Sequence, residues 1–296
     1  MKRVAIFGRD VREDVAAGLE GIRDELRASG VEVTVYAPLR ERLRGEGWNG
    51  ESFASAGELA GTDMLFSVGG DGTFLDAVLL ARDSGVPVLG LNGGRLGFLA
   101  GASREDFAGL AGRLARGEYA VERRALARLA VEGEDFGGFA YALNEVSVLK
   151  TADSSLLEIY AHVDGEYLTR YWADGLLVAT PTGSTAYSLS CGGPIVAPSC
   201  DNLILTPVCP HNLTMRPLVL PGDVEVRLRV RSRTEEFVLG VDSRMERVTD
   251  EREVRVSSAG FKINVVKLEG HSFFSTLRGK LMWGEDARNA QWTDVE

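Results

Sequence analysis

The chain has few cysteines and no long apolar run, and each absence excludes a class of protein. Its three cysteines, Cys191, Cys200 and Cys209, are an odd, sparse set that makes no disulfide framework and has no zinc-site spacing. No apolar stretch approaches the roughly 18 residues that a membrane-spanning helix needs. The first residues have the pattern of a strand and lack the apolar core of a signal peptide. We therefore expect a cytoplasmic protein with reduced thiols, which does not bind a membrane.

Positive charge is also scarce. The 296 residues include 33 Lys and Arg against 43 Asp and Glu, which gives a net charge of −10 and a pI near 5.0. This balance argues against a nucleic-acid footprint and against an anionic membrane surface, although it leaves room for a locally basic phosphate pocket. A hydrophobic content of 45% suits a globular protein of one large or two medium domains.

The residue pattern predicts two domains. Strand-like runs alternate with helical ones over the first hundred residues, which predicts an α/β domain with a parallel sheet and a site at the carboxyl ends of its strands. The short strands that follow predict a β-rich domain. We place the α/β domain at residues 1–105 with the C-terminal segment 270–296, and the β-rich domain at 106–269. The helix-like stretch Ser272–Met282 needs a partner face, which we expect on the α/β domain. We expect the Gly- and Ser-rich stretch Trp48–Ala60 to be a mobile loop.

The most informative segment is Gly69-Gly70-Asp71-Gly72-Thr73, between a predicted strand and a predicted helix. A helix N-terminus presents unpaired N–H groups, and glycines let a phosphate approach the backbone. An Asp inside such a cradle suggests phosphoryl transfer, in which Asp71 is either the general base or a group beside the metal ion. The alternative is a tight turn in which Asp71 only caps the helix.

Three other segments carry unusual polar residues. A second glycine-rich turn, Asn92–Leu99, follows the next predicted strand and so points to the same crevice. The stretch Thr180–Ser190 gathers hydroxyls and backbone amides around one glycine; it is either a holder for a ribose or diphosphate, or a Ser/Thr-rich β-turn. Asn144-Glu145 interrupts a strand-like run, either at a bulge facing solvent or in a pocket that binds ligand hydroxyls.

Taken in order, these residues resemble the NAD kinase family. The matching segments are Gly69–Gly72, Asn92–Leu99, Asn144-Glu145, Asp174-Gly175, Gly183–Tyr187, and Pro210-His211 with Arg216-Pro217. Lipid kinases and 6-phosphofructokinases carry similar glycine turns, whereas the stretch Asp174–Pro194 is much more specific. The resemblance implies an N-terminal α/β domain, a β-rich C-terminal domain and a homodimer or homotetramer. It implies transfer of the ATP γ-phosphate to the 2′-hydroxyl of the adenosine ribose of NAD, which makes NADP. A divalent metal such as Mg²⁺ would arrive with ATP, with no protein-held metal site and no tightly bound organic cofactor.

The same resemblance assigns roles to residues. Asp71 would accept the proton, and Gly69, Gly70, Gly72 and Thr73 would bind the ATP phosphates. The NAD-binding residues would be Asp71, Gly72, Asn144, Glu145, Trp172, Asp174, Thr185, Ala186, Tyr187, Ser188, Leu189, Ser190, Cys209 and Arg244.

Two positions depart from the pattern of the family. Many members carry a cation at the position of Trp172 and a Gln at that of Arg244. The Trp172 indole either stacks on the nicotinamide ring, with weak discrimination against NADH, or is a core or subunit-interface aromatic. The preference for NAD or NADH, and the use of polyphosphate in place of ATP, stay open.

Two other functions were weighed against this one. A diacylglycerol- or sphingosine-type lipid kinase shares the glycine turn, but the acidic pI, the lack of a basic amphipathic segment and the stretch Gly183–Tyr187 argue against it. An NAD(P)-binding regulator without catalysis would not need the carboxylate of Asp71 beside incoming phosphates.

Overall fold

A computed structural model describes residues 1–43, 46–48, 50–93, 97–133 and 140–283. The chain divides into two compact units: Met1–Glu122 together with Val265 onward, and Arg123–Asn264. The first unit thus extends beyond residue 105, where the sequence pattern changes. Within the described residues, no helix is both long and apolar enough to cross a membrane.

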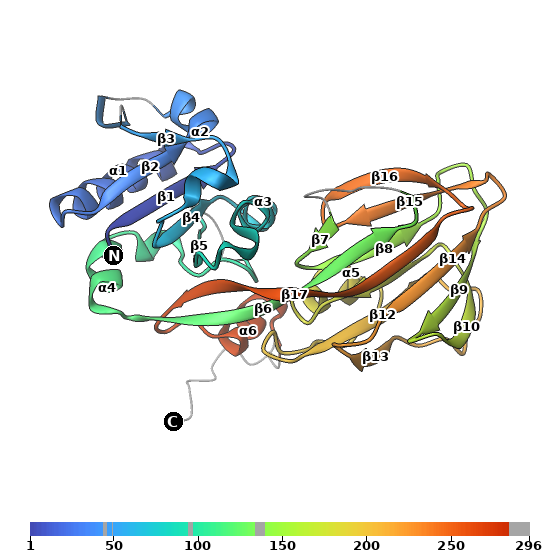
Figure 1. Ribbon diagram of the computed structural model, residues 1–296. Coiled ribbons are helices and arrows are strands. Elements are labelled where there is room, and N and C mark those ends of the chain that lie inside the picture. The colour runs from blue at the N-terminus through green and yellow to red at the C-terminus, as the bar shows by residue number, and fades with distance from the viewer. Residues whose placement is uncertain (44–45, 49, 94–96, 134–139, 284–296) are drawn as a thin grey trace. The chain divides into compact units, whose positions relative to one another are not determined.

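The first unit is built on a parallel sheet (Figure 1). Its strand order is β3-β2-β1-β4-β5, and the end of β17 pairs in parallel with β5. The bounds are β1 Arg3–Gly8, β2 Glu32–Tyr36, β3 Ser52–Phe53, β4 Met64–Val68, β5 Val88–Leu91 and β17 Glu253–Leu268. The central strands are buried along their length, as expected for a parallel sheet with helices on both faces. The predicted α/β domain is confirmed.

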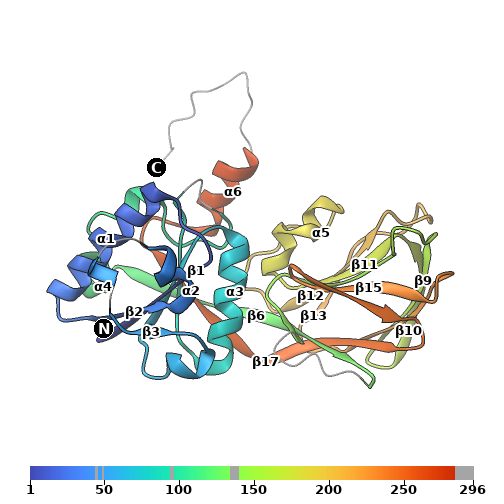
Figure 2. The same ribbon diagram turned by 90° about the horizontal axis from the view of Figure 1, so that it is seen from above.

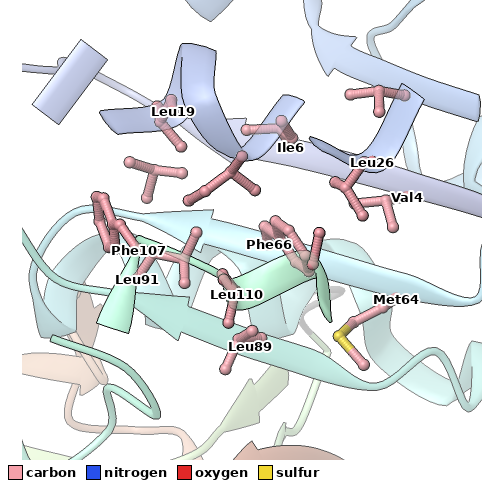
Figure 3. Packing of buried hydrophobic residues seen from close by; sticks show 14 of the residues in the cluster. Val4, Ile6, Leu19, Leu26, Met64, Phe66, Leu89, Leu91, Phe107 and Leu110 are labelled. Atoms are coloured by element: carbon pink, nitrogen blue, oxygen red, sulfur yellow. The ribbon is translucent and has the colours of Figure 1, made fainter. Parts of the chain in front are cut away.

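Helices cover both faces of this sheet. The bounds are α1 Glu13–Ala28, α2 Ala37–Arg42, α3 Asp71–Ala81, α4 Leu110–Arg116 and α6 Phe273–Leu281. Figure 2 shows α1 and α4 on one face and α3 on the other. The apolar face of α1 repeats at helical spacing, and Figure 3 shows Leu19 and Leu26 packed with Ile6, Phe66 and Leu110. This packing fixes the carboxyl ends of β4 and β5, where the two glycine-rich turns begin.

The expectation of a mobile loop at Trp48–Ala60 is wrong. Trp48 is only 2% exposed, and the Arg23 guanidinium lies 4.4 Å from the centroid of its ring. Phe53 lies in β3, and Leu59 ends a 3₁₀ turn and is buried. These three apolar side chains anchor an otherwise polar segment to the core.

The segment that follows the second glycine turn is a broken helix. The sequence Ser103-Arg104-Glu105-Asp106 predicts a capping box that opens a helix to about Arg116. The box forms between Ser103 and Asp106, but it opens a 3₁₀ turn at Arg104–Asp106. Gly109 then adopts φ +73°, and α4 begins after it. In the C-terminal segment, Leu277 of α6 is buried whereas Phe274 is 64% exposed.

The second unit consists of two antiparallel sheets, which confirms its predicted β-rich character (Figure 1). One has the order β13-β12-β11-β8-β15-β16; the other has β10-β9-β14-β17, and β6 pairs with both β17 and β7. The bounds are β6 Tyr119–Val131, β7 Tyr141–Ala142, β8 Glu145–Leu149, β9 Leu157–Val163, β10 Glu166–Ala173, β11 Gly175–Ala179, β12 Asn202–Val208, β13 Leu218–Pro221, β14 Val226–Arg231, β15 Glu236–Val241 and β16 Arg244–Thr249. Apolar residues of both sheets form one core. The sequence pattern predicts two short strands at Glu253–Val256 and Phe261–Val266, and in the structure both are parts of the single long strand β17.

Candidate functional site

The Gly-Gly-Asp-Gly turn joins β4 to α3 through a conformation that needs glycine. Gly69 adopts φ +150°, and a Cβ there would lie 2.5 Å from Thr73 Oγ1. The Gly69 N–H donates to Leu91 O at 3.0 Å, which ties this turn to the end of β5. Gly70 is the N-cap of α3, and apart from the neighbouring backbone no atom of the described residues lies within 4 Å of a Cβ built at Gly70 or Gly72. The described part of the chain therefore leaves space for a ligand in front of the helix N-terminus.

The Asp71 carboxylate faces the second glycine-rich turn. Among the described residues, no side chain makes a capping hydrogen bond at the start of α3, so Asp71 does not act as the helix cap that one interpretation of the sequence suggested. Asp71 Oδ1 accepts a hydrogen bond from the Leu99 N–H at 3.4 Å. A Cβ at Gly97 would lie 2.0 Å from Asp71 Oδ1, so only glycine fits against the carboxylate. Gly94, Arg95 and Leu96 of the same motif lie outside the described residues.

A cavity of about 190 Å³ lies beside Gly69 and Gly70, and Arg12 is on its wall. The Arg12 Nη2 donates to Gly93 O at 2.9 Å, and the same nitrogen lies 3.3 Å from Asp14. The complete lining is Asp10, Val11, Arg12, Val15, Val68, Gly69, Gly70, Asn92 and Gly93. The sequence analysis missed Arg12, although its position just after a strand of the parallel sheet was a usable signal.

In the second unit, the stretch Thr180–Ser190 forms a 3₁₀ turn at Thr182–Thr185 and the short helix α5, Tyr187–Ser190. The Thr180 N–H donates to Asn144 O at 2.8 Å, and a Cβ at Gly183 would lie 2.0 Å from the same oxygen. The Ser188 and Thr206 hydroxyls are 2.8 Å apart. Several hydroxyls of this stretch thus fix the turn, which places α5 beside the strands (Figure 2).

Asp242 organises the backbone around Asn144-Glu145. Its carboxylate accepts N–H bonds from Leu143 at 2.9 Å, Asn144 at 2.8 Å and Glu145 at 3.2 Å. Burial raises the pKa of Asp242, and these three N–H bonds oppose that rise. Asp242 itself has φ +53°, a conformation that Asp tolerates better than most residues. The sequence analysis singled out Arg244 in this segment and missed Asp242.

Glu145, in the second unit, has a strongly raised pKa. Its side chain is 8% exposed, so it does not face solvent at a bulge. Burial, and next the charge of Asp242, raise its pKa to about 8, while the Tyr187 backbone N–H bonds the carboxylate and opposes that rise. Among the described atoms, Oε2 has no hydrogen-bond partner. A buried carboxyl oxygen without a partner is costly unless a ligand completes it.

Further predicted residues lie near this carboxyl group. Asp174 forms an ion pair with Lys150 at 2.8 Å, and its N–H donates to Val208 O, directly before the exposed Cys209. Burial raises the pKa of Tyr187, with smaller contributions from Cys191, Cys209, Asp174 and Glu145. These groups are therefore electrostatically coupled within one region. Thr185, Ala186, Leu189 and Ser190 are partly or fully exposed along the same turn.

Trp172 and Arg244 have protein contacts of their own. The Trp172 side chain is 40% exposed, so it is not a core aromatic. The Arg170 guanidinium lies 4.7 Å from its ring centroid, and the His211 ring packs edge-on at 6.2 Å. The Arg244 guanidinium donates to Val241 O at 3.2 Å and to Tyr141 O at 2.8 Å.

The predicted residues fall into two groups. The Gly-Gly-Asp-Gly turn, the second glycine turn and the Arg12 cavity belong to the first unit. Asn144, Glu145, Trp172, Asp174, Thr185–Ser190, Cys209 and Arg244 belong to the second. The first group offers a phosphate cradle with a carboxylate, and the second offers hydroxyls, amides and a buried acid.

Comparisons with known proteins agree with this division. The family model of the ATP-NAD kinase N-terminal domain matches residues 13–119, and that of the ATP-NAD kinase C-terminal domain matches residues 143–268. The NAD kinase of Cytophaga hutchinsonii is 42% identical over 238 residues, which cover 80% of this chain and 82% of that protein. The NAD kinase of Flavobacterium psychrophilum is 38% identical over 97% of this chain and 100% of that protein.

Two solved structures are similar in fold. The crystal structure of an NAD kinase from Archaeoglobus fulgidus in complex with ATP has a TM-score of 0.72 at 27% identity, and the match covers 95% of this chain and 98% of that one. The crystal structure of yeast NADH kinase complexed with NADH has a TM-score of 0.82 at 24% identity, over 100% of this chain and 90% of that one.

Proposed function

The chain belongs to the NAD kinase family, and from that premise we propose that it transfers the γ-phosphate of ATP to the 2′-hydroxyl of the adenosine ribose of NAD, with Asp71 as the proton acceptor. Its reaction is the phosphorylation of NAD by ATP, which makes it a phosphotransferase with an alcohol group as acceptor. One observation carries the role of Asp71: its carboxylate lies at an open helix N-terminus yet caps nothing.

The proposed step is a single displacement at phosphorus. A ribose hydroxyl is a poor nucleophile, and phosphoryl transfer depends mostly on positioning and on charge stabilisation. Asp71 orients the hydroxyl and accepts its proton as the new O–P bond forms and the bond from phosphorus to the ADP oxygen breaks. The open N–H groups at the start of α3 stabilise the charge on the phosphates.

The donor nucleotide is proposed to bind in the first unit. Gly69, Gly70, Gly72 and Thr73 would approach the ATP phosphates through the backbone, and the Arg12 guanidinium would supply positive charge from the cavity wall. ATP-dependent kinases take their nucleotide with a divalent metal ion. We therefore assign the divalent ion, which we expect to be Mg²⁺, to the phosphates of ATP.

NAD is proposed to bind to the second unit, around Glu145. Near neutral pH the raised pKa keeps the Glu145 carboxyl group mostly protonated, so it donates one hydrogen bond and accepts another. Such a group matches the vicinal hydroxyls of a ribose. Asn144, held through its backbone by Asp242, would bind beside it. The contacts proposed for Trp172, Asp174, the stretch Thr185–Ser190, Cys209 and Arg244 rest on the family resemblance and on their place in this unit.

Assembly and location are also proposals. We infer a homodimer or homotetramer from the family resemblance, which size-exclusion chromatography with light scattering would test. We infer a cytoplasmic location from the composition, supported by the free state of Cys191, Cys200 and Cys209.

The substitution Asp71→Asn tests the proposed chemistry. It keeps the shape of the side chain but removes the charge that accepts the proton, so kcat should fall by about 10²–10⁴-fold. Circular dichroism should show an unchanged fold, and calorimetry should show that NAD still binds. Asp83→Asn makes the same chemical change at an exposed residue beyond α3 and should leave kcat unchanged. A near-normal kcat in Asp71→Asn would show that Asp71 only positions other groups.

A further inference from the structure

A buried lysine lies behind the turn that faces Asp71. Lys267, near the end of β17, is only 7% exposed. Its Nζ donates to Ala100 O at 2.8 Å and to Phe98 O at 3.4 Å. An ammonium group is expensive to bury unless hydrogen bonds replace its water, so these carbonyls are held at fixed positions. Two of its hydrogen bonds therefore go to backbone carbonyl groups.

The two carbonyls flank the residue that contacts the carboxylate. Leu99 N–H donates to Asp71 Oδ1 at 3.4 Å. That N–H and the Phe98 carbonyl belong to one planar peptide group, and in a trans peptide they point in opposite directions. Lys267 thus holds one side of the peptide while Asp71 accepts a hydrogen bond from the other. The ammonium group also polarises the peptide, which strengthens the N–H as a donor.

The surrounding packing leaves this segment little freedom. A Cβ at Gly101 would lie 2.2 Å from Val266 O, and a Cβ at Gly90 would lie 2.9 Å from Ala100 Cα. The N–H groups of Gly101 and Ala102 both donate to Gly90 O at 3.0 Å. The segment is wedged between β5 and β17, so a shift of the Phe98–Leu99 peptide is transmitted to the Asp71 side chain.

We propose that Lys267 is a positioning residue for phosphoryl transfer, which holds the Phe98–Leu99 peptide so that the Leu99 N–H aims the Asp71 carboxylate at the acceptor hydroxyl. The inference rests on the proposed role of Asp71. Lys267 touches neither substrate, and its effect reaches the reaction only through the orientation of that carboxylate.

The substitution Lys267→Met tests the proposal because it keeps the length and apolar stem of the side chain and removes the ammonium group. Misplacement of a catalytic group by about 1 Å costs up to about 100-fold in rate. We expect kcat to fall by about 10–100-fold, with the KM for NAD and for ATP changed by less than about threefold. Lys267→Arg, which retains a charged donor, should recover part of kcat. If Lys267→Met does not fold, Lys267→Gln replaces it: the amide lacks the charge and its donor reaches less far, so kcat should still fall while KM changes by less than about threefold.

Two controls separate this proposal from a structural role and from the role of Asp71. Lys262→Met removes a lysine from the same strand, where Lys262 pairs with Asp201 at 3.2 Å, and should leave kcat unchanged. In an Asp71→Asn background, Lys267→Met should lower kcat by less than about twofold, because both changes act through one group. An equal loss in both backgrounds, or a loss confined to KM, would overturn the role of Lys267. A near-normal kcat in Asp71→Asn alone would instead overturn the role of Asp71.

Discussion

The effect of Glu145→Gln on stability should depend on pH: the variant should be close to the wild type at acid pH and more stable than the wild type at alkaline pH. In the folded protein, burial and the neighbouring Asp242 raise the Glu145 pKa to about 8 from an ordinary value of 4.5. The folded state therefore holds a proton that the unfolded state releases, and stability falls as pH rises. The stabilising contribution is fully present below about pH 4.5 and is lost as pH rises through about 8. Gln keeps the shape of the neutral acid and does not titrate.

The size of this effect follows from the same values. Each pKa unit corresponds to about 1.4 kcal/mol of differential stability. Between about pH 5.5 and about pH 8.5, the wild type should lose about 3 kcal/mol of unfolding free energy through this group. The loss of unfolding free energy over the same pH range should be smaller in the Gln variant by this amount. At about pH 5.5 the two proteins should be within about 1–2 kcal/mol of each other, and at about pH 8.5 the variant should be the more stable.

Urea unfolding followed by intrinsic fluorescence at the two pH values measures this difference. Titrating groups that do not interact with Glu145 are common to both proteins, so they cancel in the comparison. Glu246→Gln makes the same chemical change at an exposed carboxyl group on β16 and is the matched control. If Glu145→Gln loses stability with pH as steeply as the wild type does, then Glu145 does not hold a proton in the folded state and our account of its hydrogen bonding to ribose is wrong.

Four further substitutions test the rest of the proposed site. Asn144→Ala should raise the KM for NAD by about 2–10-fold and leave that for ATP nearly unchanged, since a lost hydrogen bond costs about 0.5–1.5 kcal/mol; equal effects on both substrates in steady-state assays would indicate a structural role. Arg12→Ala should raise the KM for ATP by about 10–100-fold, because a charge-assisted bond to phosphate is lost; an unchanged KM for ATP would remove Arg12 from the donor site. Gly97→Ala should lower kcat at least tenfold, because its Cβ would lie 2.0 Å from Asp71 Oδ1, whereas Gly57→Ala, with open space around it, should not. If Trp172 stacks on nicotinamide, the kcat/KM values for NAD and NADH should be similar, and a strong preference for NAD that survives Trp172→Ala would exclude the stacking.

The sequence predicted the parts of the site that local chemistry determines. The Gly69–Gly72 turn, with an Asp between a strand and a helix, can be predicted because the glycines and the helix start are neighbours in the chain. The hydroxyl-rich stretch Thr180–Ser190 can be predicted because its hydroxyl groups are also neighbours in the chain. Even so, the sequence left open whether Asp71 caps its helix, because the Gly97 and Leu99 contacts that orient it come from another turn.

The features that the sequence analysis missed depend on distant partners. Asp242 holds the backbone of residues nearly a hundred positions earlier, and nothing local in its own segment indicates this. The polar residues around Trp48 predict a loop. The guanidinium of Arg23, which packs on the Trp48 ring, lies on α1, so the local sequence does not show this contact. Lys267 looks like an ordinary charged residue near a strand end until its carbonyl partners are known. Local propensity gives no information on such tertiary contacts.

The discontinuity of the first unit has a consequence for how the protein is made. Residues 1–122 form most of this unit, but the strand segment that covers the edge of β5 begins at Val265. During synthesis, the second unit must therefore emerge from the ribosome before the parallel sheet of the first unit is complete. Until then β5 has an open edge, which is a template for mispairing with other chains. Non-local pairing of this kind also slows folding, so the nascent chain carries this open edge through the translation of more than half its length.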